Sequence, residues 1–543
     1  MGRYILKTDK GRPPIVRHII NGNSTLWGPM IEVFNPATGQ IIGEVPVSLS
    51  WIDLEVLDKS ARRAQECWYR EVTEQEKELV FRAIIAKIEH HRGALARTMV
   101  LEAGKLWRWA DAEVQETIDT LWHYHGELSR CYTHDGFTRC QMPDKNAFSI
   151  LKPYGVVLGI TPWNFPLAIP FWKMCGSLAG GNAIVLKTAE QTPFTAEIAV
   201  GLVLTSIYEV IDGDRRESLR GLVQLVHGKG ETSGKLLLEN LNYDKVAFTG
   251  SVETGKIVAS TAGSRLKPCH LELGGHAAMV VLDDFDIDLA VAEAISANLG
   301  DSGQRCVSAR VVFVQESKYR EFVSKYLERA RARVIGNPMD FSTEMGPLIS
   351  KEQLQRVNGQ VGKTIDQLNK GPVIGGFPTS PERLAAELGC GYYYEPTVFV
   401  DVPYGITAMD EEIFGPVMVI NPLPGRNREE AFRNGVDLVN RSKYGLSNAL
   451  LTNDRQLASR ASWLFNTGLL YIGRGTTGAE LNKYFGGVKN SGWGREGKGL
   501  DDWTQITQVY DDHHGKARMA QEGANEKVKK TISEARSPLE IEI

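Results

Sequence analysis

Cys306, in the stretch "DSGQRC", is the first of three residues whose types suit covalent chemistry at a carbonyl carbon. It lies in a glycine-containing loop next to Arg305, just before an apolar run. A partly open, electropositive loop favours the thiolate, which is the nucleophilic form of cysteine. None of the other six cysteines has such neighbours, and most are expected to be small buried hydrophobes. By itself, Cys306 fits a buried core thiol equally well.

Glu272 and Asn164 are the other two candidates. Glu272 lies between two leucines in "HLELGGH", and an apolar slot raises the pKa of a carboxylate towards the range of a general base. Asn164 is held between prolines and aromatic residues in "TPWNFP", where a rigid amide N–H can stabilise an oxyanion. Taken singly, a structural strand-end glutamate and an ordinary turn asparagine are the plainer interpretations.

The stretch "KVAFTGSVETGKI", residues 245–257, comes close to a phosphate-binding P-loop. Gly250 and Gly255 precede Lys256, but Ile257 stands where a P-loop has the Ser or Thr that binds magnesium. Phosphoryl transfer depends on that metal, so we reject a nucleotide hydrolase. A strand, a glycine turn around Ser251 and a helix start still suit the pyrophosphate of a dinucleotide.

Short apolar runs alternate with amphipathic segments from Pro153 onwards. This alternation predicts a parallel sheet covered on both faces, in which ligands bind beyond the carboxyl ends of the strands. The residues that follow the runs are therefore candidates for a cofactor site: Thr161, Pro162 and Trp163; Lys187 to Glu190; Gly228 to Gly230; and Gly250 to Gly255.

Lys187 and Glu190 suggest which dinucleotide would bind. Lys187 offers a cation or a ribose contact, and Glu190 can accept hydrogen bonds from ribose hydroxyls. A carboxylate at this place repels a 2′-phosphate, so NAD is favoured over NADP. On their own, the two residues also fit solvated loop charges.

Other stretches predict the remaining elements. "EVFNPATGQIIGEVPV" indicates a hairpin, Ser50 and Asp53 start a helix that runs to about Tyr69, and residues 74–130 are helical. A second strand–helix alternation, from "HAAMVVLDD" to about residue 473, predicts a second α/β domain. After Tyr510 the sequence becomes a polar tail.

Composition narrows the class of protein. The 543 residues carry 62 basic and 66 acidic side chains, a balance that does not favour nucleic acid as a partner. No membrane span and no signal peptide are predicted, and the expected location is cytoplasmic. Seven scattered cysteines without a CxxC pair predict neither a disulfide framework nor a metal site.

Taken together, these stretches resemble the NAD(P)-dependent aldehyde dehydrogenase superfamily from about Asn35 to Glu496. The ordered motifs are "NPATGQ", "GITPWNFPL", "GNAIVLKTAEQTP", "FTGSVETG", "LELGG", "GQRC", "EPTVF", "EEIFGPV" and "FGGVKNSGWGRE". The resemblance implies an α/β fold with a Rossmann-type NAD-binding domain (1–129 and 152–273) and a catalytic domain (274–483). It also implies a strand-rich oligomerisation element (130–151 and 484–513), followed by a tail (514–543).

The resemblance also implies roles. Cys306 attacks the aldehyde to give a thiohemiacetal, whose oxyanion is held by Asn164 and the backbone N–H of Cys306. Glu272 activates the water that hydrolyses the thioester left after hydride transfer. Lys187 and Glu190 meet the adenine ribose, Glu412 meets the nicotinamide ribose, and Phe414 positions the nicotinamide.

Two alternative functions and three departures from the family pattern remain. Glu272 disfavours a coenzyme-A-acylating relative, and the three intact catalytic residues disfavour a non-catalytic protein on the same fold. Asp301, His276 and Gly473 depart from the residues common in the family. The last of these opens "GRGTTGAE", a stretch that resembles the loop of semialdehyde-oxidising members.

The implied substrate is thus an aldehyde with an acid or amino-acid end, and the candidate anchors are Arg474, Thr476, Thr477 and Gly478. An ordinary turn with broad specificity is the alternative. A homodimer or homotetramer is expected, with the tail packed on a neighbouring subunit or else disordered.

Overall fold

The computed structural model describes residues 13–130, 138–139, 145–497 and 499–512. These residues fall into two compact units. The first comprises the described residues up to 130 and from 152 to 505, and the second comprises those within 132–151 and from 506 onwards. The predicted tail, residues 514–543, lies outside the described residues, so its proposed packing on a neighbouring subunit stays a prediction.

An eight-stranded sheet forms one half of the first unit. Its five central strands are parallel to one another, and the edge strands β1, β2 and β21 are antiparallel. The apolar runs predicted as strands are therefore confirmed. In spatial order the strands are β2 (Asn23–Thr25), β1 (His18–Ile20), β9 (Val223–Val226), β8 (Ala183–Lys187), β7 (Val156–Ile160), β10 (Lys245–Thr249), β11 (Cys269–Glu272) and β21 (Gly492–Trp493).

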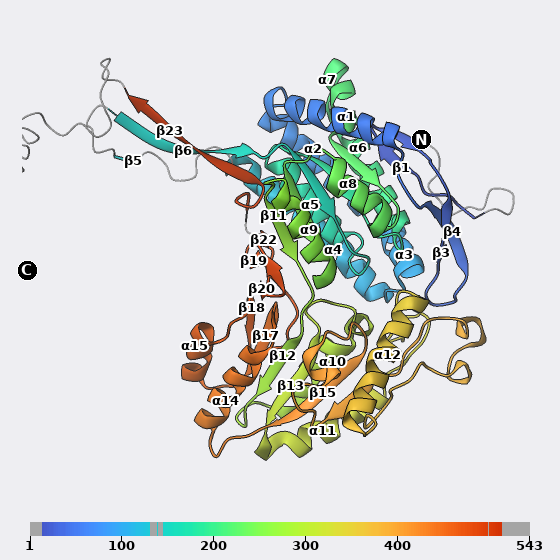
Figure 1. Cartoon of the computed structure of the whole chain (residues 1–543), viewed down its shortest axis with the longest axis vertical. Helices are drawn as coiled ribbons and strands as arrows, with labels where there is room; N and C mark the ends of the chain where they lie inside the picture. Colours follow the sequence, from blue (N-terminus) through green and yellow to red (C-terminus); the bar gives the residue numbers. More distant parts are fainter. Residues whose placement is uncertain (1–12, 131–137, 140–144, 498, 513–543) are drawn as a thin grey trace, which may run out of the picture. The chain divides into compact units, whose positions relative to one another are not determined.

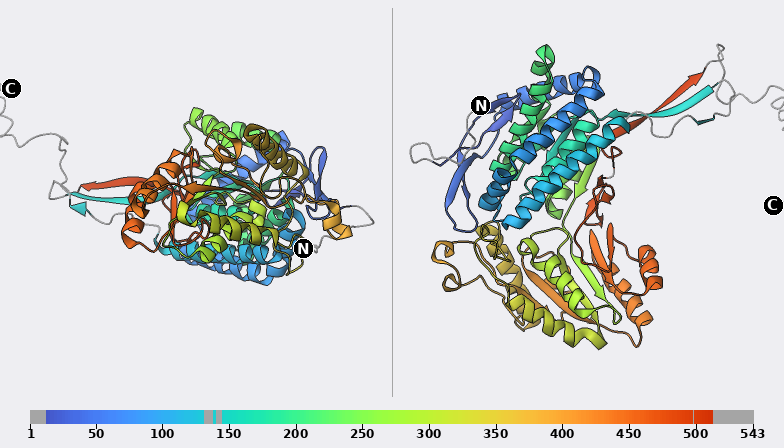
Figure 2. Two further views of the ribbon diagram at one scale, coloured as in Figure 1. Left: turned by 90° about the horizontal axis from the view of Figure 1, so that it is seen from below. Right: turned by 180° about the vertical axis from the view of Figure 1, so that it is seen from behind.

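Helices cover both faces of this sheet, which explains why its central strands are continuously apolar. Every residue of β8 is buried, and α5 packs on β7 and β8. Figure 1 shows α5, α8 and α9 on one face, and Figure 2 shows the blue helices of residues 74–127 from behind. The helices are α1 (Trp51–Arg70), α2 (Glu74–His90), α3 (Arg92–Ala103), α4 (Trp107–Glu127), α5 (Ala168–Ala179), α6 (Pro193–Val210), α7 (Gly213–Ser218), α8 (Lys235–Asn240) and α9 (Val252–Ser264).

The start of the first helix follows the prediction from sequence. The Ser50 hydroxyl accepts a hydrogen bond from the backbone N–H of Asp53, which satisfies one of the free donors of the first turn. The predicted hairpin is also present, as β3 (Met30–Phe34) paired antiparallel with β4 (Ile41–Pro46). The predicted helical stretch 74–130 is confirmed as three long helices and a short 3₁₀ turn.

A six-stranded sheet, all parallel, forms the other half of the first unit and confirms the second α/β alternation. Alternate residues of its central strand face two separate apolar clusters: Val280 packs in one, and Met279 and Val281 pack in the other. The strands are β14 (Thr397–Val400), β15 (Val417–Leu423), β13 (Ala309–Gln315), β12 (Ala277–Val281), β17 (Ser447–Leu451) and β18 (Leu469–Ile472). The helices around them are α10 (Ile287–Leu299), α11 (Glu316–Arg331), α12 (Lys351–Leu368), α13 (Thr407–Asp410), α14 (Arg428–Arg441) and α15 (Arg455–Leu464) (Figure 1).

A small three-stranded sheet contains most of the described residues of the second unit. Its order is β23 (Thr504–Asp512), β6 (Lys145–Pro153) and β5 (Thr138–Arg139). The short strands between 484 and 497 pair elsewhere: β19 (Tyr484–Phe485) with β22 (Glu496–Gly497), and β20 (Val488–Lys489) with β16 (Tyr444–Gly445). The domain boundaries expected from the resemblance stay predictions.

Helix α6 has the length and composition of a membrane span. Its mean hydropathy is 1.3, and within the described part of the chain it alone meets both criteria. However, 61% of the helix is buried inside the protein, where it packs on α2 and β9. This burial is typical of a core helix.

Candidate active site

The loop that carries Cys306 is held in an unusual backbone conformation. It connects α10 to β13 through a 3₁₀ turn (η4, Gly300–Gly303) in which Asp301 and Ser302 have φ angles of 49° and 54°. Such left-handed angles are uncommon for residues other than glycine and need support from their surroundings. Arg310 of β13 supplies part of it, because its guanidinium donates to the carbonyl oxygens of Gly303 at 2.6 Å and Arg305 at 3.2 Å.

Arg305 does not create the electropositive setting that the sequence suggested for Cys306. Its guanidinium bonds to Asp301 at 3.0 Å and lies 4.4 Å from the ring centre of Trp109. Burial, together with the carboxylates of Glu412 and Glu272, raises the pKa of the Cys306 thiol to about 12. The backbone N–H groups of Cys306 and Val307 oppose this rise. The prediction of a thiolate favoured by Arg305 is therefore wrong for the protein without cofactor.

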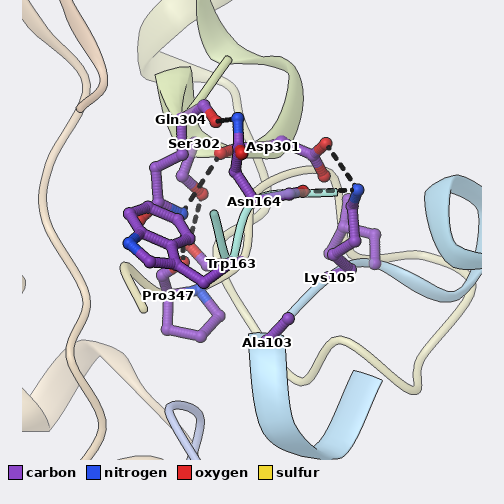
Figure 3. Close-up of a pocket in the computed structure, with 11 residues that line it drawn as sticks. Ala103, Lys105, Trp163, Asn164, Asp301, Ser302, Gln304 and Pro347 are labelled. Atoms are coloured by element: carbon purple, nitrogen blue, oxygen red, sulfur yellow. Dashed lines mark hydrogen bonds and ion pairs between the residues drawn. The ribbon is translucent and has the colours of Figure 1, made fainter. Parts of the chain in front are cut away.

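Asn164 is fixed to the backbone of the same loop. Its side-chain amide donates to the carbonyl oxygen of Gln304 at 3.1 Å, two residues before Cys306. Figure 3 shows Asn164 between Gln304 and Lys105. The ammonium group of Lys105 donates to the backbone carbonyl oxygen of Asn164 at 2.8 Å. The side-chain amide has a second N–H that the bond to Gln304 does not use. Asn164 lines a pocket with Lys105 and Gln304, and its predicted bond to a substrate oxygen stays a prediction.

A buried cluster of charged side chains fixes the position of Asn164 relative to the Cys306 loop. Lys105 bonds to Glu113 as well as to Asn164, and its ammonium group lies 3.6 Å from Asp301. The other carboxylate oxygen of Glu113 accepts from the backbone N–H groups of Leu167 and Ala168 at 2.9 and 3.0 Å, at the start of α5. A single ammonium group thus links the Asn164 loop and the Cys306 loop, as Figure 3 shows, and its bond to Glu113 adds helix α4.

Glu272, at the end of β11, is a buried acid with a charged partner. Burial raises the pKa of Glu272 to about 7, and the neighbouring His270 opposes the rise. One carboxylate oxygen, Oε1, lies 2.9 Å from His270 Nε2. The flanking leucines led us to expect a raised pKa for Glu272, and the pKa is raised. The side chain has charged as well as apolar neighbours.

The nucleophile loop and the end of β11 contribute to the lining of one cavity of about 440 Å³. Both Cys306 and Glu272 line it, together with Arg474, Thr477 and Gly478 of the predicted substrate loop. Gly473, at the start of that loop, has a φ of 73°, which glycine and asparagine both adopt, so its replacement of the usual asparagine is tolerated. The structure therefore brings most of the predicted catalytic and substrate residues to one space.

Thr476 is the exception among the predicted substrate anchors. Its side chain is buried outside the cavity lining, and its hydroxyl donates to the carbonyl oxygen of Val307 at 2.6 Å. A hydroxyl has one hydrogen to donate, and here the backbone takes it. The hydroxyl of Thr476 is therefore not available to a substrate carboxylate, because it already holds the Cys306 loop, and a contact through the backbone of Thr476 stays a prediction.

The predicted cofactor residues gather at one edge of the first sheet. β9, β8, β7 and β10 are adjacent and parallel, so Gly228, Lys187, Thr161 and Gly250 all lie at their carboxyl ends. Lys187 Nζ lies 3.2 Å from Glu190 Oε2. The buried hydroxyls of Thr161 and Thr188 have no hydrogen-bond partner among the described residues. Unpaired donors at strand ends fit a polar ligand such as a dinucleotide.

The glycine turn at the start of helix α9 has a packing role. The Ser251 hydroxyl caps the helix by accepting from the Thr254 N–H at 3.2 Å. A Cβ atom on Gly255 would come within 2.4 Å of the Leu273 side chain, so glycine lets α9 approach the end of β11. Lys256 is exposed on the helix surface, as predicted.

Glu412 and Phe414 lie in the loop between α13 and β15 and contact both groups of candidates. The Glu412 carboxylate accepts from the backbone N–H of Gly275 at 3.1 Å, and burial raises its pKa to about 7. The ring of Phe414 meets the ring of Trp163 edge to face, with centres 5.5 Å apart. These contacts place the two predicted nicotinamide residues next to Trp163 and to the chain that follows Glu272.

Several site residues were missed from the sequence. His270 was detectable, because residues two apart on a strand share a face and His270 precedes Glu272 by two. Asp502, Lys173 and Glu496, which surround this pair, come from distant segments and carry no local signal. Lys105 and Glu113 were hidden for the same reason.

Comparisons with known proteins place these features in context. A family model described as "Aldehyde dehydrogenase family" matches residues 24–509. A mitochondrial aldehyde dehydrogenase of Rattus norvegicus is 35% identical over 486 residues, covering 88% of this chain and 87% of that protein. A probable succinate-semialdehyde dehydrogenase (NADP(+)) of Sinorhizobium fredii is 33% identical over 480 residues, covering 88% and 91%. The crystal structure of betaine aldehyde dehydrogenase from Staphylococcus aureus in complex with NAD+ is similar at a TM-score of 0.84 and 28% identity, covering 92% of this chain and 95% of that chain.

Proposed function

This chain belongs to the aldehyde dehydrogenase family, and we propose that it oxidises an aldehyde with NAD to the free carboxylic acid through a thioester on Cys306. Its family makes it an oxidoreductase that converts aldehydes to acids. The observation that carries the finer proposal is that Cys306 and Glu272 line one cavity. The side-chain amide of Asn164 donates to the carbonyl oxygen of Gln304, which precedes Cys306 by two residues.

Each catalytic residue has a separate task in this reaction. The Cys306 sulfur adds to the aldehyde carbon, and the resulting oxyanion is stabilised by the Asn164 amide and the backbone N–H of Cys306. A nicotinamide held by Glu412 and Phe414 would supply the acceptor for the hydride on that carbon. Glu272 then takes a proton from water, whose oxygen attacks the thioester. The carbon–sulfur bond breaks, and the acid leaves.

Glu272 supports hydrolysis over transfer to coenzyme A. A pKa of about 7 leaves a large fraction of the carboxylate ionised near neutral pH, while the group remains basic enough to take a proton from water. A coenzyme-A-acylating enzyme needs no such base, because its second nucleophile is a thiol.

For the cofactor, the charges at the end of β8 support NAD. Glu190 holds a negative charge 3.2 Å from Lys187 at the edge where the adenine ribose is expected. The carboxylate accepts from ribose hydroxyls and repels a 2′-phosphate. When NAD binds, its adenosine and pyrophosphate part would be held by residues at the strand ends and the start of α9: Thr161, Lys187, Glu190, Gly228 and Ser251. Glu412 and Phe414 would hold its nicotinamide end.

For the substrate, we retain an aldehyde with a carboxylate or amino-acid end. Arg474, Thr477 and Gly478 line the cavity that contains Cys306, and Arg474 offers a cation to a carboxylate. Glu116 lines the same cavity and offers an acid to an ammonium group. The alternative is a broad specificity in which this loop is an ordinary turn.

One assay tests the whole proposal. We expect NADH formation from a panel of aldehydes, independent of added coenzyme A, with carboxylate-bearing aldehydes giving the highest kcat/KM. Cys306→Ala should abolish the activity, whereas Lys256→Ala, on the surface of α9, should leave it unchanged. Equal kcat/KM for matched aldehydes with and without a carboxylate would refute the substrate proposal. A strict need for coenzyme A would refute hydrolysis.

Assembly and location are two further parts of the proposal. A homodimer or homotetramer is what the family resemblance implies, and the exposed edges of a small strand-rich element favour a partner chain. The cytoplasm remains the predicted location. Sedimentation of the purified chain measures its oligomeric state. Imaging of a tagged chain measures its location.

A further inference from the structure

His270 is bonded at both ring nitrogens to carboxylates. It precedes Glu272 by two residues on β11, so both side chains lie on the same face of the strand. Its Nε2 lies 2.9 Å from Glu272 Oε1, and its Nδ1 lies 2.6 Å from Asp502 Oδ2. Lys245 lies 2.8 Å from the other oxygen of Asp502. These contacts form a chain, Lys245–Asp502–His270–Glu272, which ends at the predicted general base.

When both carboxylates are ionised, this geometry requires a charged histidine. Ionised carboxylates only accept hydrogen bonds, so a ring that bonds to two of them donates from both nitrogens and is an imidazolium. The side chains of His270 and Glu272 are 1% and 3% exposed, whereas that of Asp502 is 16% exposed. Burial opposes the charge on His270, but Asp502 and Glu496 outweigh it and raise the pKa of His270 to about 10.

The bond from His270 distinguishes the two oxygens of Glu272. Oε1 is occupied by His270, whereas Oε2 is buried and has no hydrogen-bond partner among the described residues. A carboxylate oxygen left unpaired in a buried place is unstable unless a neighbouring charge compensates it. The imidazolium is such a charge, and Oε2 is the oxygen left to take a proton.

Other charged groups around Glu272 do not replace His270. Lys173 of α5 is near, but its ammonium group lies 2.5 Å from Glu496 Oε1 of β22 and is neutralised there. Cys306, from the loop before β13, also interacts with Glu272, but its thiol is uncharged at neutral pH. Among the described groups that influence Glu272, His270 is the cation bonded to it directly.

We propose that His270, fixed by Asp502, is a positioning residue that holds Glu272 by Oε1 and keeps Oε2 ionised as the base for thioester hydrolysis. The inference rests on the proposed function. In the step concerned, an O–H bond of water breaks and its proton goes to Oε2. The water oxygen bonds to the thioester carbon, the carbon–sulfur bond breaks, and the Cys306 sulfur leaves as a thiolate.

An ester probe isolates this step from hydride transfer. 4-Nitrophenyl acetate acetylates an accessible reactive cysteine and releases nitrophenolate, without any cofactor. After the excess ester is removed from the full-length protein, intact mass spectrometry follows the loss of the acetyl group with time. The decay rate, measured between pH 5.5 and 9.5, reports thioester hydrolysis alone.

Four variants separate the parts of the inference. His270→Ala removes both the donor and the charge, His270→Gln retains a donor without the charge, and Asp502→Asn removes the carboxylate that stabilises the charge. His90→Gln, at an exposed position on α2, is the matched control. Asp502→Asn also keeps the test informative if the changes at His270 prevent folding.

The expected results follow from the effect of the His270 charge on the pKa of Glu272. Losing the imidazolium raises the pKa of Glu272, so the rise of the decay rate with pH moves to higher pH in all three site variants. At pH 7 we expect decay to be roughly tenfold slower or more, since a positioned general base contributes about 10²–10⁴-fold. At pH 9.5, His270→Gln approaches the parent rate, His270→Ala stays slow, and His90→Gln behaves as the parent throughout.

Two results would overturn the inference. One is decay in the site variants that matches the parent at every pH. The other is uniformly slower decay with an unchanged pH midpoint, which would show a structural role only. Failure of the parent protein to become acetylated at Cys306 even after long exposure to the ester at pH 9.5, where more of the thiol is ionised, is a different result, because it would count against Cys306 as the nucleophile of the proposed function.

Discussion

The hydroxyl group of Thr476 donates a 2.6 Å hydrogen bond to the carbonyl oxygen of Val307, the residue after Cys306. The Thr476 carbonyl in turn accepts from the Ser447 hydroxyl at 2.7 Å. The substrate loop is thereby tied on one side to the nucleophile loop and on the other to β17. The side chain of Thr476, which the sequence suggested as a substrate anchor, thus links two loops that both line the cavity of Cys306.

Thr476→Val should therefore destabilise the protein. The substitution keeps the shape but leaves the Val307 carbonyl without this donor, at a cost of about 1–3 kcal/mol in the free energy of unfolding. Urea unfolding measures the change. Thr477→Val, at the neighbouring position that lines the cavity, should alter stability by less than about 0.5 kcal/mol. Equal stabilities for both variants would show that the Thr476 bond is unimportant.

Cys306 should react slowly with alkylating reagents when no cofactor is bound. With a pKa of about 12, its thiolate fraction rises about tenfold for each pH unit throughout the neutral range. The rate of iodoacetamide labelling between pH 7 and 9.5 should follow this slope. Glu412→Gln removes one of the negative charges that raise the pKa, so it should accelerate labelling. A plateau below pH 9 in the parent protein would contradict the raised pKa.

Asp301→Asn should destabilise the protein at neutral pH, although the family resemblance led us to expect asparagine at this position. Although burial alone would raise the pKa of Asp301, Lys105 and Arg305 together hold it below its ordinary value. Losing the charge-assisted bond to Arg305 should cost about 1.5–3 kcal/mol at pH 7.

The pH dependence of this difference has a definite sign. The folded protein lowers the pKa of Asp301, so the stabilisation is fully present above the unfolded value of about 3.9 and is lost as pH falls through the folded pKa. Urea unfolding of parent and variant should therefore differ at pH 7 and converge in acid. A gap that widens towards acid would show that Asp301 is neutral in the folded protein.

Glu190→Gln should shift cofactor preference towards NADP. The variant retains the size and a hydrogen-bonding group of the side chain but loses the charge that repels a 2′-phosphate, and Lys187 is freed from its ion pair at 3.2 Å. We expect the ratio of kcat/KM for NADP to that for NAD to rise roughly tenfold, which corresponds to about 1.4 kcal/mol. Glu253→Gln, on the exposed side of α9, is the matched control. An unchanged ratio would place the adenine ribose elsewhere.

Local patterns in the sequence were sufficient to predict the elements of the fold. Buried parallel strands must be continuously apolar and must end at turn residues, so runs such as those before Thr161 and Lys187 are visible without any structure. The cap at Ser50 is likewise local, since its bond reaches only three residues along the chain. Family motifs then indicated Cys306, Glu272 and Asn164, because each lies in a short and distinctive stretch.

Tertiary structure decided the electrostatics and the partners of those residues. Arg305 is next to Cys306 in sequence, yet it pairs with Asp301, and the charges that do influence the sulfur belong to Glu412 and Glu272. His270 meets Asp502 across 232 residues of chain. The energy of a charge depends on distance and burial in space, and the order of residues along a chain fixes neither of them. The sequence by itself thus determined which groups could react, and the fold determined their protonation and their neighbours.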